Sequence, residues 1–270
     1  MSTTASLAEL VAPLRADPTA AAILLDVDGT LAPITRHPSD AAVPESTRTR
    51  LSAVAQHYGL VACVSGRRAT EARRIVSIGR LTYIGNHGIE LLAPGASRAQ
   101  MSTEMQAWAG RVQAFAAHED TPELSRLRIR LEDKLAIAGF HWRGAPDEDA
   151  AQAAAREIAG RAQRAGFATH WGRKVLEVRP PLAFDKGAGI EALLRDTTIS
   201  TALYAGDDAT DLDAFAALTR MVETGELTTA VRVGVRSPEG PAAIVEQADL
   251  VVDGQLGIDR LLDALIGAGD

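Results

Sequence analysis

The chain has 270 residues, 46% of them hydrophobic and 23% charged, a composition typical of folded globular proteins that excludes an intrinsically disordered chain. The net charge of -7 disfavours nucleic-acid binding, which usually needs a basic surplus. No apolar run approaches the roughly 20 residues of a membrane span, and the first residues lack a basic start and an apolar signal core. The single cysteine, Cys63, cannot form an internal disulfide. We therefore expect a cytoplasmic protein with no membrane or nucleic-acid partner.

The first part of the chain alternates short apolar runs with helical patterns. The predicted strands cover residues 22–25, 60–64 and 81–85, and the predicted helices between them cover residues 44–57 and 69–76. The first apolar run stops at acidic residues and Gly29, which is typical of a buried strand that ends in a loop. Strands that alternate with helices predict βαβ units and a parallel sheet.

The middle of the chain has a different pattern. Helices are predicted over residues 101–117 and 147–165, and strands over residues 127–133, 135–142 and 174–179. The order of two strands, a helix and a further strand favours a small α+β module with an antiparallel sheet. Turn residues mark its edges at Pro94–Gly95 and Pro180–Pro181.

The alternating pattern resumes after the second proline pair. Predicted helices cover residues 186–194, 208–218 and 258–266, and predicted strands cover residues 202–205, 231–235 and 250–252. The fold class that follows is α/β, with a Rossmann-like parallel sheet core that is discontinuous in sequence. We place the core at residues 1–92 and 182–270 and an inserted α+β cap at residues 93–181. In the absence of a heptad pattern or a long exposed apolar strand, a monomer is expected.

Polar side chains follow three of the predicted strands at the point where each strand ends. These groups are Asp26-Val27-Asp28-Gly29-Thr30, Ser65-Gly66-Arg67 and Gly206-Asp207-Asp208, and a further group, Asp185-Lys186-Gly187, opens a helix. The carboxyl ends of parallel strands share one edge of a sheet, which is where ligands bind in open α/β sheets.

Three carboxylates brought to one place repel each other unless a cation lies between them. Asp26, Asp28 and Asp207 would supply oxygen ligands that suit Mg²⁺, and Asp28 can also offer its backbone carbonyl. Ser65 and Lys186 suit the non-bridging oxygens of a phosphoryl group, so the site fits phosphoryl transfer. Taken alone, DVDGT is also compatible with a turn whose aspartates bond their own backbone. Four such motifs in order favour the catalytic interpretation.

In order, the motifs DVDGT, SGR, DKG and GDDATD resemble those of the haloacid-dehalogenase-type phosphohydrolases, and the insert resembles the larger, C2-type cap of these enzymes. The segments GNHGIEL, LEDKLAIAGFHWR, KVLEVRPPLAFDKG and GDDATDLDAF are similar to those of the trehalose-6-phosphate phosphatases. This resemblance implies an enzyme, a phosphoric monoester hydrolase with Mg²⁺ as cofactor. Its substrate would be a phosphorylated disaccharide, trehalose 6-phosphate, hydrolysed to trehalose and inorganic phosphate.

The resemblance also implies roles for the catalytic residues. Asp26 would be the nucleophile and form an aspartyl-phosphate. Asp28 would protonate the departing sugar oxygen and then deprotonate the hydrolytic water, while its backbone carbonyl reaches the metal. Asp207 would be the second carboxylate on the metal. The phosphoryl oxygens would be held by Thr30, Ser65 and Lys186, and the residues that orient Lys186 or metal-bound water would be Asp208 and Asp211.

For the sugar, the resemblance implies one group of residues in the cap and one in the core. The cap residues are Glu132, Lys134 and Glu177, and the core residues are Arg67, Asn86, His87 and Glu90. Carboxylates and amides suit a polyol because each forms several hydrogen bonds with hydroxyls. The cap residues are equally compatible with exposed strand positions paired across a sheet, and His87 with a turn. The other histidines lack metal-ligand spacing and are expected to be surface or structural, and Cys63 is expected in the core.

One position departs from the family pattern. Leu212 stands where these phosphatases usually carry a glutamate after the last motif. A site built for hydroxyl contacts loses discrimination when one partner is missing. The alternative substrates are therefore another phosphorylated disaccharide, a glycosyl-phosphoglycerate or a pseudo-disaccharide. Two other classes stay open, namely a non-catalytic sugar-phosphate sensor and a phosphotransferase or mutase, although strands in the insert disfavour the last.

Overall fold

A computed structural model describes residues 7–35, 37–237 and 240–267 of the chain. These residues form two compact units, one made of the described residues up to Gln100 and from Phe184 onward, and the other of Met101–Ala183. The second unit is thus an insertion in the first, with boundaries after residues 100 and 183 where the sequence pattern placed them after residues 92 and 181. Among the described residues, no helix combines the length and the apolar character that crossing a bilayer requires.

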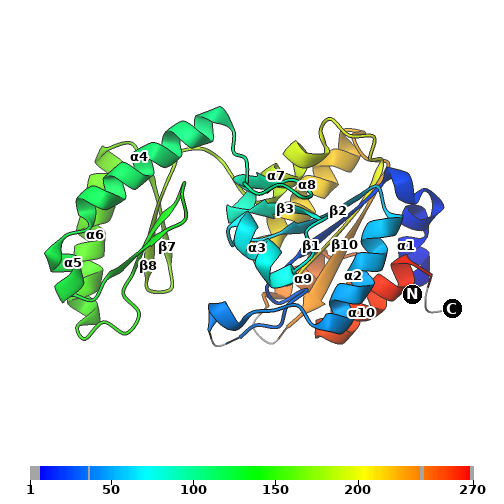
Figure 1. Cartoon of the computed structure of the whole chain (residues 1–270), viewed down its shortest axis with the longest axis horizontal. Coiled ribbons are helices and arrows are strands. Elements are labelled where there is room, and N and C mark those ends of the chain that lie inside the picture. Colours follow the sequence, from blue (N-terminus) through cyan, green and yellow to red (C-terminus); the bar gives the residue numbers. More distant parts are fainter. Residues whose placement is uncertain (1–6, 36, 238–239, 268–270) are drawn as a thin grey trace. The chain divides into compact units, whose positions relative to one another are not determined.

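The first unit is built on a seven-stranded sheet with the strand order β11-β10-β9-β1-β2-β3-β4. Figure 1 labels β1, β2, β3 and β10 of this sheet. Its strands are β1 (Ala21–Asp26), β2 (Leu60–Val64), β3 (Thr82–Gly85), β4 (Glu90–Leu92), β9 (Thr201–Gly206), β10 (Thr229–Arg236) and β11 (Leu250–Asp253). The pairings are parallel except that β4 runs antiparallel to β3. The α/β class and the parallel sheet predicted from the sequence are therefore confirmed.

Helices cover both faces of this sheet because successive residues of its central strand, β1, point to opposite faces and all of them are buried. The helices are α1 (Leu7–Ala16), α2 (Glu45–His57), α3 (Ala69–Val76), α7 (Lys186–Leu194), α8 (Asp211–Glu223), α9 (Ala242–Gln247) and α10 (Gly254–Leu265), with short 3-10 turns at Pro18–Ala20, Pro38–Asp40 and Asn86–Gly88. Ile23 and Leu25 belong to the core with α1, α2, α3 and α10, whereas Ala22 and Leu24 belong to the core with α7, α8 and α9.

The inserted unit is a four-stranded antiparallel sheet with helices packed on one face. Its elements are α4 (Thr103–Glu119), α5 (Pro122–Arg126), β5 (Arg130–Asp133), β6 (Ala138–His141), α6 (Glu148–Arg164), β7 (Ala168–Gly172) and β8 (Val175–Arg179). The strand order is β5-β6-β8-β7. Phe140 and Leu176 are fully buried in a core shared with α4 and α6, so the alternate positions of both strands face away from the helices.

Five elements were missed by the sequence patterns, namely α1, β4, α5, β7 and α9, and several others begin a few residues from their predicted starts. α1 contains Pro13, β4 has only three residues, and β7 is an exposed edge strand without apolar alternation. The helix predicted from residue 208 begins at Asp211 instead. Its first turn is delayed because the backbone N–H groups of Asp207 and Asp208 bond to the Asp211 carboxylate.

Candidate active site

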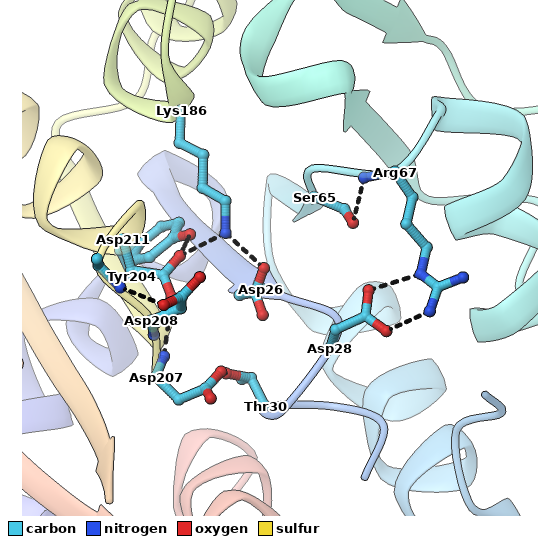
Figure 2. Close-up of polar contacts among 11 residues, drawn as sticks. Asp26, Asp28, Thr30, Ser65, Arg67, Lys186, Tyr204, Asp207, Asp208 and Asp211 are labelled. Atoms are coloured by element: carbon cyan, nitrogen blue, oxygen red, sulfur yellow. Dashed lines mark hydrogen bonds and ion pairs between the residues drawn. The ribbon is translucent and has the colours of Figure 1, made fainter. Parts of the chain in front are cut away.

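Three of the polar groups singled out in the sequence lie at one edge of the sheet (Figure 2). Asp26 is the last residue of β1, and Ser65 and Asp207 directly follow β2 and β9, the two parallel neighbours of β1. Lys186 opens α7 and extends its side chain toward the same place (Figure 2). Parallel pairing on both sides of β1 thus brings together residues that are up to 181 positions apart (207 minus 26).

The side chain of Lys186 is buried between the carboxylates of Asp26 and Asp211. Its Nζ atom donates hydrogen bonds of 2.6 Å to Asp26 Oδ1 and of 2.6 Å to Asp211 Oδ1. Burial alone would lower the pKa of Lys186, but the two carboxylates outweigh it and hold this pKa above its ordinary value. The ammonium is therefore charged at any physiological pH.

The carboxylates outnumber the cations in this cluster. Single oxygens of Asp26, Asp207 and Asp211 lie within 4.8 Å of one another, and all three side chains are buried. Burial raises the pKa of Asp26 well above its usual range, against the opposing charge of Lys186. Buried oxygens with an excess of negative charge are the donor set that a hard divalent cation such as Mg²⁺ requires, so the residues present fit this ion.

The Asp207 carboxylate packs directly against the backbone of Gly29. Thr30 Oγ1 donates a hydrogen bond of 3.2 Å to Asp207 Oδ1. Gly29 has a φ of 89°, and a Cβ atom at this position would lie 2.2 Å from Asp207 Oδ2. Burial, with the charge of Asp211, raises the pKa of Asp207 to about 6. The glycine of the DVDGT motif is therefore required both by the backbone turn and by the carboxylate above it.

Asp28 does not join the other carboxylates through its side chain. Arg67 holds it in a two-pronged contact, with Nε 2.7 Å from Asp28 Oδ2 and Nη2 2.8 Å from Oδ1. Figure 2 shows the Asp28 carboxylate turned toward Arg67 and away from Asp26. The third guanidinium nitrogen of Arg67 bonds to Glu71 at 2.6 Å. Arg67, expected at the sugar, is thus engaged with a catalytic candidate in this structure.

Ser65 lies at the floor of the loop after β2, with only 1% of its surface exposed. Its Oγ atom accepts a hydrogen bond of 3.1 Å from the backbone N–H of Arg67. Its own backbone N–H donates to Ile84 of the next strand at 2.9 Å. The backbone of β3 therefore fixes where this hydroxyl lies.

The loop after β3 contains three of the residues expected to contact the sugar. Asn86 and His87 both have a φ of 55°, and the His87 ring lies directly over Gly66. Asn86 is fully buried, and Glu90 is 1% exposed. One Glu90 oxygen accepts a 2.9 Å hydrogen bond from the N–H of Ala69, the first residue of α3, whose helix dipole favours a carboxylate there. Asn86 and Glu90 thus lie within the fold, and of the three only His87 is half-exposed.

In the inserted unit, one row of paired residues crosses the four strands in the order Glu132, Gly139, Glu177 and His170. This row belongs to the face that points away from the helices. Lys134 Nζ lies 3.4 Å from Glu177 Oε1 and 3.6 Å from Glu132 Oε2. The structure therefore brings the three predicted cap residues together on one surface, where they contact each other.

Two residues of this surface were missed by the sequence patterns. His141 Nε2 lies 2.7 Å from Glu132 Oε2, and Arg179 donates from Nε and Nη2 to Glu177 Oε2. Although burial alone would raise the pKa of Glu177, Arg179 and Lys134 hold it below the usual range. The available signal was the two-residue period, which puts His141 on the face of Gly139 and Arg179 on the face of Glu177.

Three further positions complete the sequence-based set. Asp208 follows Asp207 and its backbone N–H bonds to the Asp211 carboxylate at 2.8 Å. Leu212, in the first turn of α8, packs against the core formed by α7, α8 and α9. Cys63 is fully buried in β2, and burial raises the pKa of its thiol, which makes it an unreactive core residue as expected.

Comparison with known proteins gives one family and several relatives. The family model described as trehalose-phosphatase matches residues 24–242. Trehalose 6-phosphate phosphatase RA3 of Zea mays is 34% identical over 218 residues, which are 74% of this chain and 59% of that protein. The trehalose-phosphate phosphatase of Mycobacterium avium is 34% identical over 248 residues, 84% of this chain and 61% of that protein. The chain thus spans about three fifths of the length of these relatives.

Solved structures show the same fold. The C-terminal domain of the trehalose-6-phosphate phosphatase of C. albicans has a TM-score of 0.71 at 19% identity and covers 99% of this chain and 100% of that one. A haloacid dehalogenase-like hydrolase from Bacteroides thetaiotaomicron has a TM-score of 0.60 at 13% identity, covering 90% of this chain and 98% of that one. At these identities the likeness concerns the fold, and it extends over both the core and the insert.

Proposed function

The chain belongs to the trehalose-phosphatase family, and we propose that it is a Mg²⁺-dependent phosphohydrolase that converts trehalose 6-phosphate to trehalose and inorganic phosphate. The family and the haloacid-dehalogenase-type fold expected from the motifs are both confirmed by the comparisons. The single observation that carries the proposal is the buried contact of Lys186 with Asp26, beside Asp207, within a chain matched by this family over residues 24–242.

We propose that the metal is held by Asp26 and Asp207, with the Asp28 backbone carbonyl as a further ligand. The buried carboxylates and the hard oxygen donor set support this assignment. When bound, the ion supplies positive charge that offsets the phosphoryl oxygens and orients the substrate phosphate. The remaining chemistry is assigned to side chains of this chain.

Asp26 is proposed as the nucleophile. One of its carboxylate oxygens accepts the hydrogen bond from Lys186, so the other oxygen is left to attack phosphorus. The attack forms an aspartyl-phosphate as the bond from phosphorus to the sugar oxygen breaks. Asp28 gives a proton to that oxygen, which releases trehalose. Water then attacks the phosphoryl group, Asp28 takes the proton from this water, and phosphate and free Asp26 result.

Positioning accounts for the remaining roles in the core. Lys186 neutralises charge on the phosphoryl oxygens, the hydroxyl of Ser65 donates a hydrogen bond to them, and Thr30 is kept as a further contact. The rigid placement of these groups supports the assignment, because Ser65 is tied to the backbone of β3 and Thr30 to Asp207. Preorganised donors cost little reorganisation when charge develops on the transferring group.

For the sugar, we propose the helix-free face of the inserted sheet as the binding surface, through Glu132, Lys134 and Glu177. Carboxylate oxygens and an ammonium gathered on one surface are groups that form hydrogen bonds with sugar hydroxyls. In the core, Arg67 and His87 are kept as sugar-contact candidates. Asn86 and Glu90 are buried, so we assign them a supporting role in the loop that carries His87.

Phosphate release from a panel of sugar phosphates tests this proposal. Trehalose 6-phosphate is expected to be hydrolysed with the highest kcat/KM, in a reaction that chelation of the metal abolishes. Asp26→Asn should abolish turnover and keep binding, whereas Asp196→Asn, a change at an exposed position, should alter neither. A trehalose 6-phosphate rate no better than that of glucose 6-phosphate would overturn the substrate assignment. Full activity of Asp26→Asn would overturn the nucleophile.

A further inference from the structure

The Asp211 carboxylate accepts hydrogen bonds from four donors. Its Oδ1 atom accepts from Lys186 Nζ at 2.6 Å and from the Tyr204 hydroxyl at 2.5 Å. Its Oδ2 atom accepts from the backbone N–H groups of Asp207 at 2.9 Å and of Asp208 at 2.8 Å. A carboxylate offers about four lone-pair positions, so all of them are in use.

This saturation distinguishes Asp211 from the other two carboxylates of the cluster. Asp26 accepts from Lys186 through Oδ1, and Asp207 accepts from Thr30 through Oδ1. Each accepts one hydrogen bond there and therefore keeps acceptor positions for a cation. Although Asp211 lies within the same 4.8 Å group, it has no acceptor position left. Its two oxygens instead connect the loop that carries Asp207 with the ammonium of Lys186.

The Tyr204 hydroxyl is the group that completes this arrangement, and the fold holds it rigidly. Tyr204 lies in β9, two residues before Gly206, and is fully buried. Its ring packs edge-on against Phe215 of α8, with the ring centroids 6.1 Å apart. A Cβ atom at Gly206 would lie 2.3 Å from Asp211 Cγ, so the carboxylate is wedged between the tyrosine and the strand backbone.

We propose that Tyr204 is a positioning residue for the phosphoryl-binding ammonium, because its hydroxyl fixes the Asp211 oxygen on which Lys186 rests. Without this hydroxyl, Asp211 Oδ1 has an empty acceptor position and draws Lys186 away from Asp26. The two bonds at Oδ2 are unaffected, so Asp207 stays in place. This role rests on the proposed function only in naming phosphate as the anion bound by Lys186.

The geometry makes Tyr204→Phe a selective change. Inorganic phosphate, titrated calorimetrically in the presence of Mg²⁺, should bind about three- to tenfold more weakly, because one of two donors on Asp211 Oδ1 is lost. Mg²⁺ titrated alone should bind within about twofold of wild type, because the backbone N–H groups of Asp207 and Asp208 keep their bonds to Asp211 Oδ2. The kcat for trehalose 6-phosphate should fall about tenfold, and more than KM rises.

Tyr83→Phe is the matched control. Tyr83 is also fully buried in a strand of the sheet, and its hydroxyl donates a 2.6 Å hydrogen bond to the backbone oxygen of Ile78, which is outside the cluster. Any general loss from removing a buried tyrosine hydroxyl appears in both variants. The proposal is overturned if the two variants bind phosphate equally well, or if Mg²⁺ and phosphate affinities fall by the same factor in Tyr204→Phe.

A second measurement leaves Tyr204 in place and tests the proposal if Tyr204→Phe does not fold. The chain has three tyrosines, so the double variant Tyr58→Phe and Tyr83→Phe, grown with 3-fluorotyrosine, carries one fluorine reporter at residue 204. Lys186→Met should shift its resonance if the two side chains share the Asp211 oxygen, and an unchanged resonance would overturn the proposal. If wild type binds Mg²⁺ and phosphate but does not hydrolyse trehalose 6-phosphate, only the proposed function fails.

Discussion

Gly29→Ala tests how the site holds its second acidic residue. Gly29 has a φ of 89°, which costs an alanine about 1–2 kcal/mol. The added methyl group would also lie 2.2 Å from Asp207 Oδ2 and 2.4 Å from Oδ1. Carbon and oxygen atoms normally keep more than about 3 Å apart, so Asp207 must move by about 1 Å.

The loss should fall on metal binding and turnover more than on folding. The free energy of unfolding is expected to decrease by the backbone strain of about 1–2 kcal/mol. Mg²⁺ affinity, measured by calorimetry, should fall more than about tenfold because the oxygens of Asp207, the proposed ligand, are displaced. The kcat/KM for trehalose 6-phosphate should fall about 100-fold, as expected for misplacement by about 1 Å.

Gly225→Ala separates strain from the steric contact. Gly225 has a φ of 80°, but a Cβ atom added there has no neighbour within 4 Å. This variant should lose similar stability, measured by urea unfolding, and keep Mg²⁺ affinity and turnover. If Gly29→Ala bound Mg²⁺ and hydrolysed substrate as well as Gly225→Ala does, the contact of Asp207 with the motif glycine would have no functional role.

Three other predictions follow from the contacts in the core. Arg67→Met removes the side chain that holds the Asp28 carboxylate by two hydrogen bonds, so kcat/KM for trehalose 6-phosphate should fall at least about tenfold. The loss should be smaller for p-nitrophenyl phosphate, because its leaving group needs no proton. Equal losses for the two substrates would contradict a role of Arg67 through Asp28. The pKa of Asp207 is raised to about 6 in the folded protein, whereas an aspartate in the unfolded chain loses its proton at about pH 4. Without metal, the contribution of Asp207 to folding stability therefore falls as the pH rises from about 4 to 6. Mg²⁺ displaces that proton, so the increase in Tm on adding Mg²⁺ should be larger at about pH 7.5 than at about pH 5, and an equal increase at both would refute the assignment. Lys186→Met leaves two buried carboxylates without their ammonium and should lower the free energy of urea unfolding by about 3–5 kcal/mol, whereas a loss under about 1 kcal/mol would show that the ion pairs contribute little.

The positions of the core motifs follow from the sequence because each depends on local pattern and one general rule. A short apolar run that ends in Asp26 or before Asp207 indicates a strand and its end. Parallel strands then place these ends at one edge of the sheet. The convergence of Asp26 and Asp207 therefore needs no knowledge of side-chain packing, whereas Lys186 begins a helix and does not follow from this rule.

Contacts that depend on packing were not predictable in this way. Tyr204 sits inside an apolar strand and is indistinguishable there from a core residue until α8 is docked and Asp211 comes into reach. The partner of Asp28 was likewise hidden, since Arg67 lies 39 positions away and the pairing depends on the conformation of two loops.

The inserted sheet shows a related limit. Glu132 and Glu177 share a row only because β6 lies between β5 and β8, an order that period-two patterns do not specify. His170 joins that row through β7, an edge strand without apolar alternation. Local pattern identifies which side chains share a face of one strand, but strand order decides which of them meet.

Charge balance sets the order in which the site can be filled. When ionised, Asp26, Asp207 and Asp211 carry three negative charges against the one positive charge of Lys186, which leaves two in excess in a buried space. A phosphate ester that arrives with further negative charge would be repelled, and Asp26, with its pKa raised by burial, would hold a proton and lose its nucleophilic character. A divalent cation matches the excess and favours the ionised form of Asp26. Binding of the cation should therefore precede productive binding of the sugar phosphate. The ammonium of Lys186 can then neutralise negative charge on the phosphoryl oxygens.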